Sequence, residues 1–230
     1  MIKLRNATKY YEVKGGRNYL FRDVTLDIPS GKNIGILGRN GAGKSTLLRI
    51  LGGIDYPSSG SVEVPHNISW PVGIVGGAQG SLTARENARF VCRLYSLGSV
   101  EIQEKISFVE EFSELGRYMD MPIKTYSSGM KSRFKFALSM AFDFDYYIMD
   151  EVLSVGDQFF KSKCEQKINE IRDTRNILLV SHGLGQLKRL CDCGILIQDK
   201  EVYYFEDINA AVAVYQGKKC VKGHEHAQSA

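Results

Sequence analysis

The chain has 230 residues, of which 43% are hydrophobic and 24% are charged. This balance predicts a folded globular protein and argues against disorder as the main state, because enough apolar side chains exist to bury a core. The formal net charge of +4 is too small to indicate nucleic-acid binding by itself.

The sequence also suggests in which cellular compartment the protein works. No apolar run reaches the roughly 18 residues that a transmembrane helix needs, and the first residues have no apolar stretch typical of a signal peptide. The five cysteines are odd in number and scattered, which favours reduced thiols over disulfides. We therefore expect a cytosolic protein, or one bound peripherally to the cytosolic side of a membrane.

The first sixty or so residues predict short β-strands, with alternating runs at 2–4, 24–28 and 61–64. An apolar run at 34–37 predicts a further strand. A helix is expected from Ser45 to Leu51, directly after a glycine-rich stretch.

That stretch, residues 38–45, matches the pattern G-x-x-x-x-G-K-[ST] at every fixed position. Its glycines allow the backbone N–H groups to face phosphate oxygens, and the following helix points its positive end at the same anion. Lys44 can reach the β- and γ-phosphates, and the Ser45 hydroxyl can ligate Mg²⁺. The position between a strand and a helix supports a phosphate-binding loop of a nucleoside triphosphatase.

The middle of the chain predicts three helices. The first follows Thr83, which forms a capping-box pattern with Glu86; the second ends near Gly116, and the third starts near Ser127. The apolar faces comprise Val91, Leu94 and Tyr95 in the first helix, Ile102, Ile106, Val109 and Phe112 in the second, and Met130, Phe134, Ala137, Leu138 and Ala141 in the third.

Two apolar runs, 146–149 and 177–180, predict buried parallel strands, with a helical crossover over 157–172. The order of elements predicts an α/β nucleotide-binding core with a helical insert at about 82–140. The residues after Gln216 are polar, and we expect them to be flexible.

Polar residues that follow predicted strands are candidates for catalysis. Asp150 ends one strand and suits a role in holding Mg²⁺, while Glu151 suits the general base that activates water. His182 follows the next strand, on the side of the sheet where ligands bind in α/β folds. Tyr10 or Tyr11 can stack on a base, although either ring can equally belong to the core.

Taken together, these residues resemble the ATP-binding subunits of ABC transporters over residues 1–215. The motifs occur in that family's order: Tyr11, the phosphate loop, Gln79 in the Q-loop, the signature at 127–130, Asp150 with Glu151, the D-loop at 154–157, and His182. The resemblance implies a P-loop, RecA-like core with an antiparallel β subdomain and a helical subdomain at about 82–140, followed by a short tail at 216–230.

The resemblance also implies ATP and Mg²⁺ as the bound groups. Tyr11 would stack on adenine, Glu151 would be the base and His182 would contact the γ-phosphate. The Mg²⁺ ligands would be Ser45, Asp150 and Gln79. The other nucleotide contacts would be Gly38, Asn40, Gly41, Ala42, Gly43, Lys44, Thr46, Ser128 and Asp157. Ser127 and Gly129 would complete the site of the opposite subunit in a homodimer.

Departures from the common pattern indicate a subgroup. The signature reads Tyr-Ser-Ser-Gly-Met at 126–130, Val152 follows Glu151, and the Q-loop region at 76–83 is short. These features resemble bacterial surface-polysaccharide exporters, and the short C-terminus is similar to the capsule-export type. The resemblance implies two copies of a polytopic membrane subunit within a larger export assembly at the cytoplasmic face of the inner membrane, with no nucleic acid bound and the polymer not bound by this chain directly.

Two alternatives stay open. The same subgroup contains exporters of O-antigen and teichoic acid, and some ABC ATPases are soluble proteins unrelated to transport. A zinc site is a weak further possibility, since Cys191 and Cys193 lack the usual two-residue gap and the other candidates lie in the polar tail.

Overall fold

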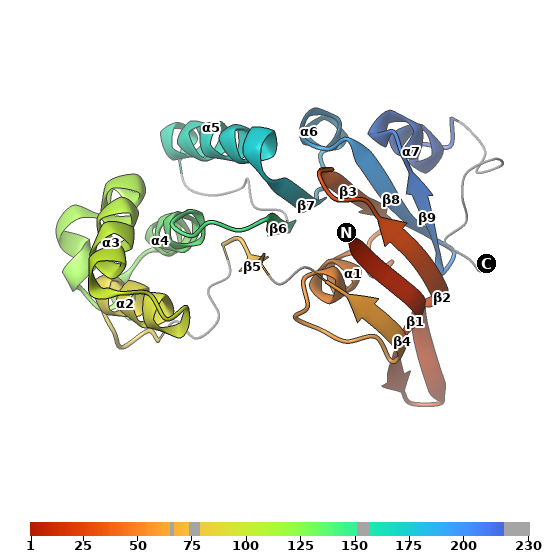
Figure 1. The fold of residues 1–230 in the computed structure, drawn as a ribbon, viewed down its shortest axis with the longest axis horizontal. Helices are drawn as coiled ribbons and strands as arrows, with labels where there is room; N and C mark the ends of the chain where they lie inside the picture. The colour runs from red at the N-terminus through yellow and green to blue at the C-terminus, as the bar shows by residue number, and fades with distance from the viewer. Residues whose placement is uncertain (65–66, 74–78, 151–156, 219–230) are drawn as a thin grey trace. The chain divides into compact units, whose positions relative to one another are not determined.

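The N-terminal strands form a three-stranded antiparallel sheet (Figure 1). Its order is β2-β1-β4, with β1 at Ile2–Val13, β2 at Gly16–Ile28 and β4 at Ser59–Glu63. The computed structural model describes residues 1–64, 67–73, 79–150 and 157–218. This sheet fulfils the expectation of an antiparallel β subdomain, although its strands β1 and β2 are much longer than the runs that predicted them.

A second sheet has six strands in the order β5-β6-β7-β3-β8-β9. Strands β3, β6, β7 and β8 run parallel, and β9 is antiparallel to β8. The bounds are Ile68–Pro71 for β5, Tyr146–Asp150 for β6, Asn176–Val180 for β7, Ile34–Gly38 for β3, Cys193–Gln198 for β8 and Glu201–Phe205 for β9. The apolar runs that predicted β3, β6 and β7 are buried, as parallel strands covered on both faces require.

Successive residues of β3 face opposite sides of this sheet. Ile34 and Ile36 belong to an apolar cluster with Leu47 and Leu48 of α1, which spans Lys44–Leu51. On the other face, a Cβ at Gly35 would lie 2.9 Å from the Ile208 side chain and 3.1 Å from that of Leu187. Those two residues belong to α7, at Ile208–Tyr215, and α6, at Leu184–Leu190.

The chain divides into two compact units. The first comprises Met1–Ser69, Asp145–Glu151 and Asn169–Ala230, and it contains the first sheet with α1, α6 and α7. The second comprises Trp70–Phe144 and Val152–Ile168. We call them the nucleotide-loop unit and the helical unit.

Helices make up most of the helical unit. They are α2 at Ala84–Leu94, α3 at Ser99–Ser113, the 3-10 helices η1 at Gly116–Asp120 and η2 at Ile123–Thr125, and α4 at Ser128–Met140. Helix α5, at Gln158–Thr174, begins in this unit and continues into the nucleotide-loop unit. Across the part of the chain that the structure describes, no helix combines the length and hydropathy that crossing a membrane requires.

The structure confirms some helix predictions and corrects others. Thr83 and Glu86 form the capping box, and Ser127 caps α4. The predicted end of α3 at Gly116 is wrong, because Glu114 takes the left-handed conformation (φ 56°) and ends the helix first. Of the apolar residues expected on one face of α2, Val91 is buried, whereas Leu94 and Tyr95 are 64% and 44% exposed.

Candidate functional site

The phosphate loop leaves β3 at a point that only glycine can occupy. A Cβ on Gly38 would lie 2.8 Å from the backbone oxygen of Ile197 in the neighbouring strand β8. Gly43 adopts φ 102° immediately before α1. These constraints turn the backbone sharply, so the first N–H groups of α1, which have no partner within the helix, face the loop.

Lys44 lies across its own loop. Its side chain is largely buried, and Nζ donates hydrogen bonds to the backbone oxygens of Gly38 at 2.9 Å and Arg39 at 3.1 Å. The ammonium group therefore lies close to the N-terminus of α1, where the helix dipole is positive. A cation, a helix N-terminus and a glycine-rich turn together form a site for a phosphate-sized anion.

A hollow of about 360 Å³ lies over this loop. Tyr11 is half-exposed there, with its hydroxyl 3.5 Å from Thr46 Oγ1. Tyr10 instead packs against Tyr19, with ring centroids 5.3 Å apart, so Tyr11 is the ring available to a base. The lining residues are Tyr11, Leu20, Asn40, Gly41, Gly43, Lys44, Ser45, Thr46 and His182.

Leu20 is a lining residue that the sequence analysis missed. Its side chain would lie 3.1 Å from a Cβ placed on Gly43, so it closes one side of the loop. Leu20 reaches this place because Tyr10 and Tyr19 are paired across β1 and β2. That register contains several bulges, and no pattern in the sequence reveals it.

Strand register brings Asp150 and His182 to the same edge of the sheet. Asp150 of β6 pairs with Val180 of β7, and Val180 also pairs with Ile36 of β3, two residues before Gly38. The turn after β7 is held by Ser181, whose Oγ accepts a hydrogen bond from the Gly183 N–H at 3.0 Å. Glu151, the predicted base, lies outside the described residues.

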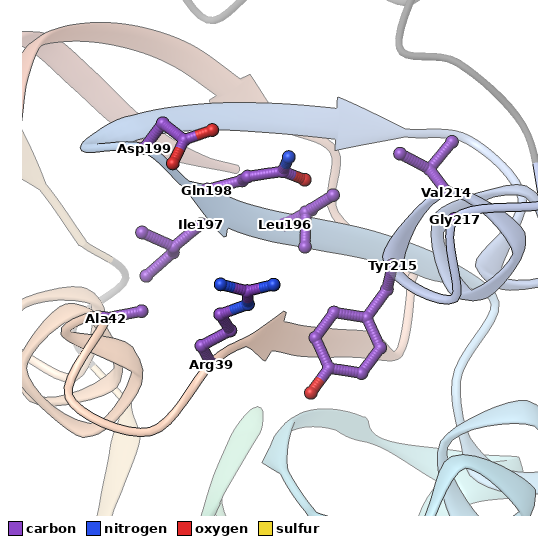
Figure 2. Close-up of a pocket in the computed structure, with 9 residues that line it drawn as sticks. All are labelled: Arg39, Ala42, Leu196, Ile197, Gln198, Asp199, Val214, Tyr215 and Gly217. Carbon is purple, nitrogen blue, oxygen red and sulfur yellow. The ribbon is translucent and has the colours of Figure 1, made fainter.

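A second hollow, of about 310 Å³, lies on the other side of the phosphate loop (Figure 2). The Arg39 side chain points from the loop into it, and Tyr215 at the end of α7 lies beside Arg39. Gln198 and Asp199 come from the end of β8 and the turn that follows. Ala42, predicted to contact nucleotide, lines this hollow.

The helical unit carries the predicted signature residues at the start of α4. The Oγ of Ser127 accepts a hydrogen bond from the Met130 N–H at 3.2 Å, as an N-cap does. A hollow of about 470 Å³ lies there, lined by Ser127, Ser128, Gly129, Met130, Ser132, Arg133 and Asp157. This helix N-terminus has serine hydroxyls and no acidic residue in its first turn, which favours an anion, and the Asp157 carboxylate that also lines the hollow is paired with Arg133.

Arg133 links three parts of the helical unit. Its guanidinium forms ion pairs with Glu114 at 3.1 Å and with Asp157. The pKa of Asp157 is lowered by a hydrogen bond from the Phe160 N–H and by Arg133. The pKa of Glu114 is lowered mainly by Lys163, 2.8 Å away. Asp157 is therefore held as an anion beside the start of α4.

Gln79 is exposed and is the first described residue after 74–78. Its backbone is bonded to the side chain of Asn87 in α2. The structure thus brings Tyr11, His182 and the phosphate loop to one hollow in the nucleotide-loop unit, and residues 127–129 with Asp157 to another in the helical unit. Neither Asp150 nor Gln79 is among the residues that line these hollows.

Comparison with known proteins decides the family. The family model described as "ABC transporter" matches residues 21–154, more than half of the chain. The chain belongs to the ABC transporter family. Its phosphate loop lies inside the matched region, and His182 and α6 lie beyond it.

Curated relatives match almost the whole length. The chain is 55% identical over 217 residues to the polysialic acid transport ATP-binding protein KpsT of Escherichia coli, covering 94% of this chain and 96% of KpsT. It is 44% identical over 215 residues to the capsule polysaccharide export ATP-binding protein CtrD of Neisseria meningitidis, covering 94% and 98%. The chain is therefore similar over nearly its full length to ATP-binding proteins of polysaccharide transport.

A solved structure of an ATP-binding cassette, a dimer in a post-hydrolysis state with ADP and phosphate, is similar in fold. The TM-score is 0.74 at 23% identity, with 90% of this chain and 99% of that chain covered. This likeness confirms the predicted P-loop ABC ATPase fold.

Proposed function

We propose that this chain is the ATP-hydrolysing motor subunit of an ABC exporter that moves capsular polysaccharide across the bacterial inner membrane. The supporting observation is the hollow over the phosphate loop, which joins Tyr11, Lys44 and His182 in one site. The polymer class follows from the full-length similarity to capsule-export ATP-binding proteins.

Different residues bind the adenine, hold the phosphates and activate the attacking water. Tyr11 stacks on adenine, the backbone of the phosphate loop and Lys44 hold the phosphates, and His182 contacts the γ-phosphate. Glu151 takes a proton from the attacking water as the water oxygen bonds to the γ-phosphorus and ADP leaves.

Mg²⁺ fits the donors present. The Ser45 hydroxyl is exposed at the start of α1, the Asp150 carboxylate ends β6, and both are the oxygen ligands that Mg²⁺ prefers. The residues that would hold the ion are Ser45, Asp150 and Gln79. When bound, the ion supplies positive charge that neutralises the phosphate oxygens.

The working assembly is a head-to-tail homodimer joined to two copies of a polytopic membrane subunit, at the cytoplasmic face. The open helix end at Ser127 and Gly129 binds the phosphates held by the partner copy, with Asp157 beside it. ATP drives closure because it binds both faces of the closed dimer and only one face of the open one.

The test is Glu151→Gln as the only copy in cells. We expect steady-state ATP hydrolysis to fall by about 10²–10⁴-fold, with ATP retained, because the water loses its base. Capsule should disappear from the surface while polymer accumulates inside. The matched control is Glu104→Gln on the exposed surface of α3, which should leave both measurements unchanged.

Other outcomes would redirect the proposal. Normal ATP hydrolysis by the Glu151→Gln variant would reject Glu151 as the base. Loss of hydrolysis with a normal capsule would leave the ATPase and reject the substrate, in favour of O-antigen, teichoic acid or a soluble role. Fractionation separates these, since only an exporter subunit should need its membrane partner to sediment with membranes.

A further inference from the structure

Asn87 is a polar side chain on the buried face of α2, with 1% of its surface exposed. Its Oδ1 accepts a hydrogen bond from the Gln79 N–H at 2.8 Å. Its Nδ2 donates to three backbone oxygens, those of Gln79 at 3.1 Å, Leu82 at 3.3 Å and Thr83 at 2.8 Å. These side-chain hydrogen bonds of Asn87 all go to residues 79–83.

Burying an amide is costly unless its donors and acceptors are satisfied. The acceptor and the two N–H donors of the Asn87 amide all find partners within the segment 79–83, where four backbone groups point at this side chain. The buried amide thus fixes the backbone of Gln79, while the residue itself stays exposed.

The opposite side of the same segment is tied to the chain that leads into α4. Lys124 N–H donates to the Gly80 oxygen at 2.9 Å, and Ile123 N–H donates to the Leu82 oxygen at 3.0 Å. Lys124 lies three residues before Ser127, the N-cap of α4. A continuous set of hydrogen bonds therefore joins Asn87, residues 79–83 and the 3-10 helix η2, which lies just before α4.

We propose that Asn87 is a positioning residue that holds Gln79 in register with the signature helix α4. Because its side chain is buried, Asn87 would act through the Gln79 backbone and not by direct contact with nucleotide or metal. The inference rests on the proposed function, since it assumes that Gln79 takes part in ATP turnover.

Replacement of Asn87 should affect Gln79 selectively. The Thr83 oxygen keeps a hydrogen bond from the Asn87 backbone N–H, and the Leu82 oxygen keeps that from Ile123. The Gln79 oxygen keeps that from the Leu82 N–H. The Gln79 N–H, however, loses its acceptor, so Asn87→Ala frees the end of the segment that carries the functional side chain.

The experiment measures kcat and KM for Mg-ATP, and the melting temperature, of the purified full chain. Asn87→Ala should lower kcat by about tenfold, in the range seen for contacting residues that act together. The matched control is Glu86→Ala. It removes the carboxylate that accepts from the Thr83 N–H at 2.8 Å, and so loosens the same helix start without touching Gln79. Both variants should melt at a lower temperature, but only Asn87→Ala should lose kcat.

A double-mutant cycle separates positioning from general destabilisation. In a Gln79→Ala background, Asn87→Ala should reduce kcat no further, because there is no side chain left to position. The proposal would be overturned if the two substitutions lowered kcat by the product of their separate effects, or if kcat were normal in Asn87→Ala. If Asn87→Ala does not fold, Asn87→Ser replaces it, since a serine hydroxyl can bond to the Thr83 oxygen but does not reach Gln79.

The two proposals fail differently. If the unaltered chain hydrolyses no ATP, the proposed function fails and this inference fails with it. If the chain hydrolyses ATP and loses that activity with Glu151→Gln, but Gln79→Ala changes nothing, the function stands and the role of Asn87 is rejected.

Discussion

The nucleotide-loop unit and the helical unit both bury apolar side chains, but they differ in how their separate elements are linked. The first is built around one apolar cluster that draws residues from β1, β2, α1 and the strands of the second sheet. Among the described residues of the second, charged side chains with more than one partner link separate helices: Arg85 pairs with Glu110 and Asp120, and Glu114 pairs with Arg133 and Lys163.

The difference follows from what each unit does. The phosphate loop needs a rigid strand and helix to hold backbone amides in place, and apolar packing supplies that. The helical unit also buries apolar side chains, Phe134, Phe136 and Phe160 among them, but the exposed Gln79 is held by hydrogen bonds between its backbone and Asn87. We therefore expect the two units to respond differently to substitution.

The largest expected effect is in the apolar cluster. Phe21 is fully buried in β2, and Phe21→Ala should lower the free energy of unfolding by about 3–5 kcal/mol through lost burial and an unfilled cavity. Urea denaturation of both proteins measures this change in the free energy of unfolding. The control is Phe90→Ala in α2, where the ring is 41% exposed and the cost should be under about 1 kcal/mol. Equal costs would contradict the burial that the contrast assumes.

The second prediction separates the effect of a substitution on ATP hydrolysis from its effect on folding stability. Lys44→Ala removes the charge at the phosphate loop and should lower kcat/KM for Mg-ATP by on the order of 10²–10³. Unfolding should change far less, because Lys44 bonds only to its own loop among the described contacts. Lys32→Ala, an exposed lysine in the same unit, is the control and should keep normal hydrolysis. Comparable activity in the two variants would reject the anion site.

A smaller effect tests the ionic links of the helical unit. Arg85 donates to Asp120 at 2.7 Å and to Glu110 at 3.0 Å, joining α2 to α3 and η1. Arg85→Met keeps the length of the side chain and should cost about 1–2 kcal/mol, as lost hydrogen bonds to charged groups do. Arg5→Met, which removes an exposed pair with Asp27 in the first sheet, should cost less. Chemical denaturation measures both, and the reverse order would remove the distinction between the units.

The same contrast explains what could be predicted from the sequence. The strand 34–37, the phosphate loop and the edge that carries Asp150 and His182 were accessible, because a fixed motif and apolar runs report local structure. The capping box at Thr83 was accessible for the same reason.

The rest depends on contacts between distant residues. The ion pairs of Arg133 could not be predicted from the sequence, since its partners Glu114 and Asp157 lie 19 and 24 residues away. Asn87 looked like an ordinary polar residue, although its place on the buried face of α2, four residues after the cap, was a usable signal. The end of α3 at Glu114 was hidden because a non-glycine residue takes the left-handed turn there.

The smallest expected effect is a loss of stability of the helical unit at low pH. The pKa values of Glu86, Glu114, Asp120 and Asp157 in the helical unit are lowered, by backbone amides or cations that favour the carboxylate. A lowered folded-state pKa gives stability that is present above the unfolded pKa and is lost as the pH falls through the folded value. The melting temperature of this unit should therefore fall as the pH is lowered from about 5 toward 3.

Trp70, the single tryptophan, makes that loss measurable, because it packs against Tyr95, Phe142 and Phe144 inside the helical unit. Its fluorescence should report a larger acid shift than far-UV circular dichroism, which also records the nucleotide-loop unit. In Arg85→Met the pKa of Asp120 returns toward its ordinary value, so the shift in tryptophan fluorescence should shrink. Coincident transitions at every pH would show that the two units unfold together, and the ionic links of the helical unit would then have no separate thermodynamic consequence.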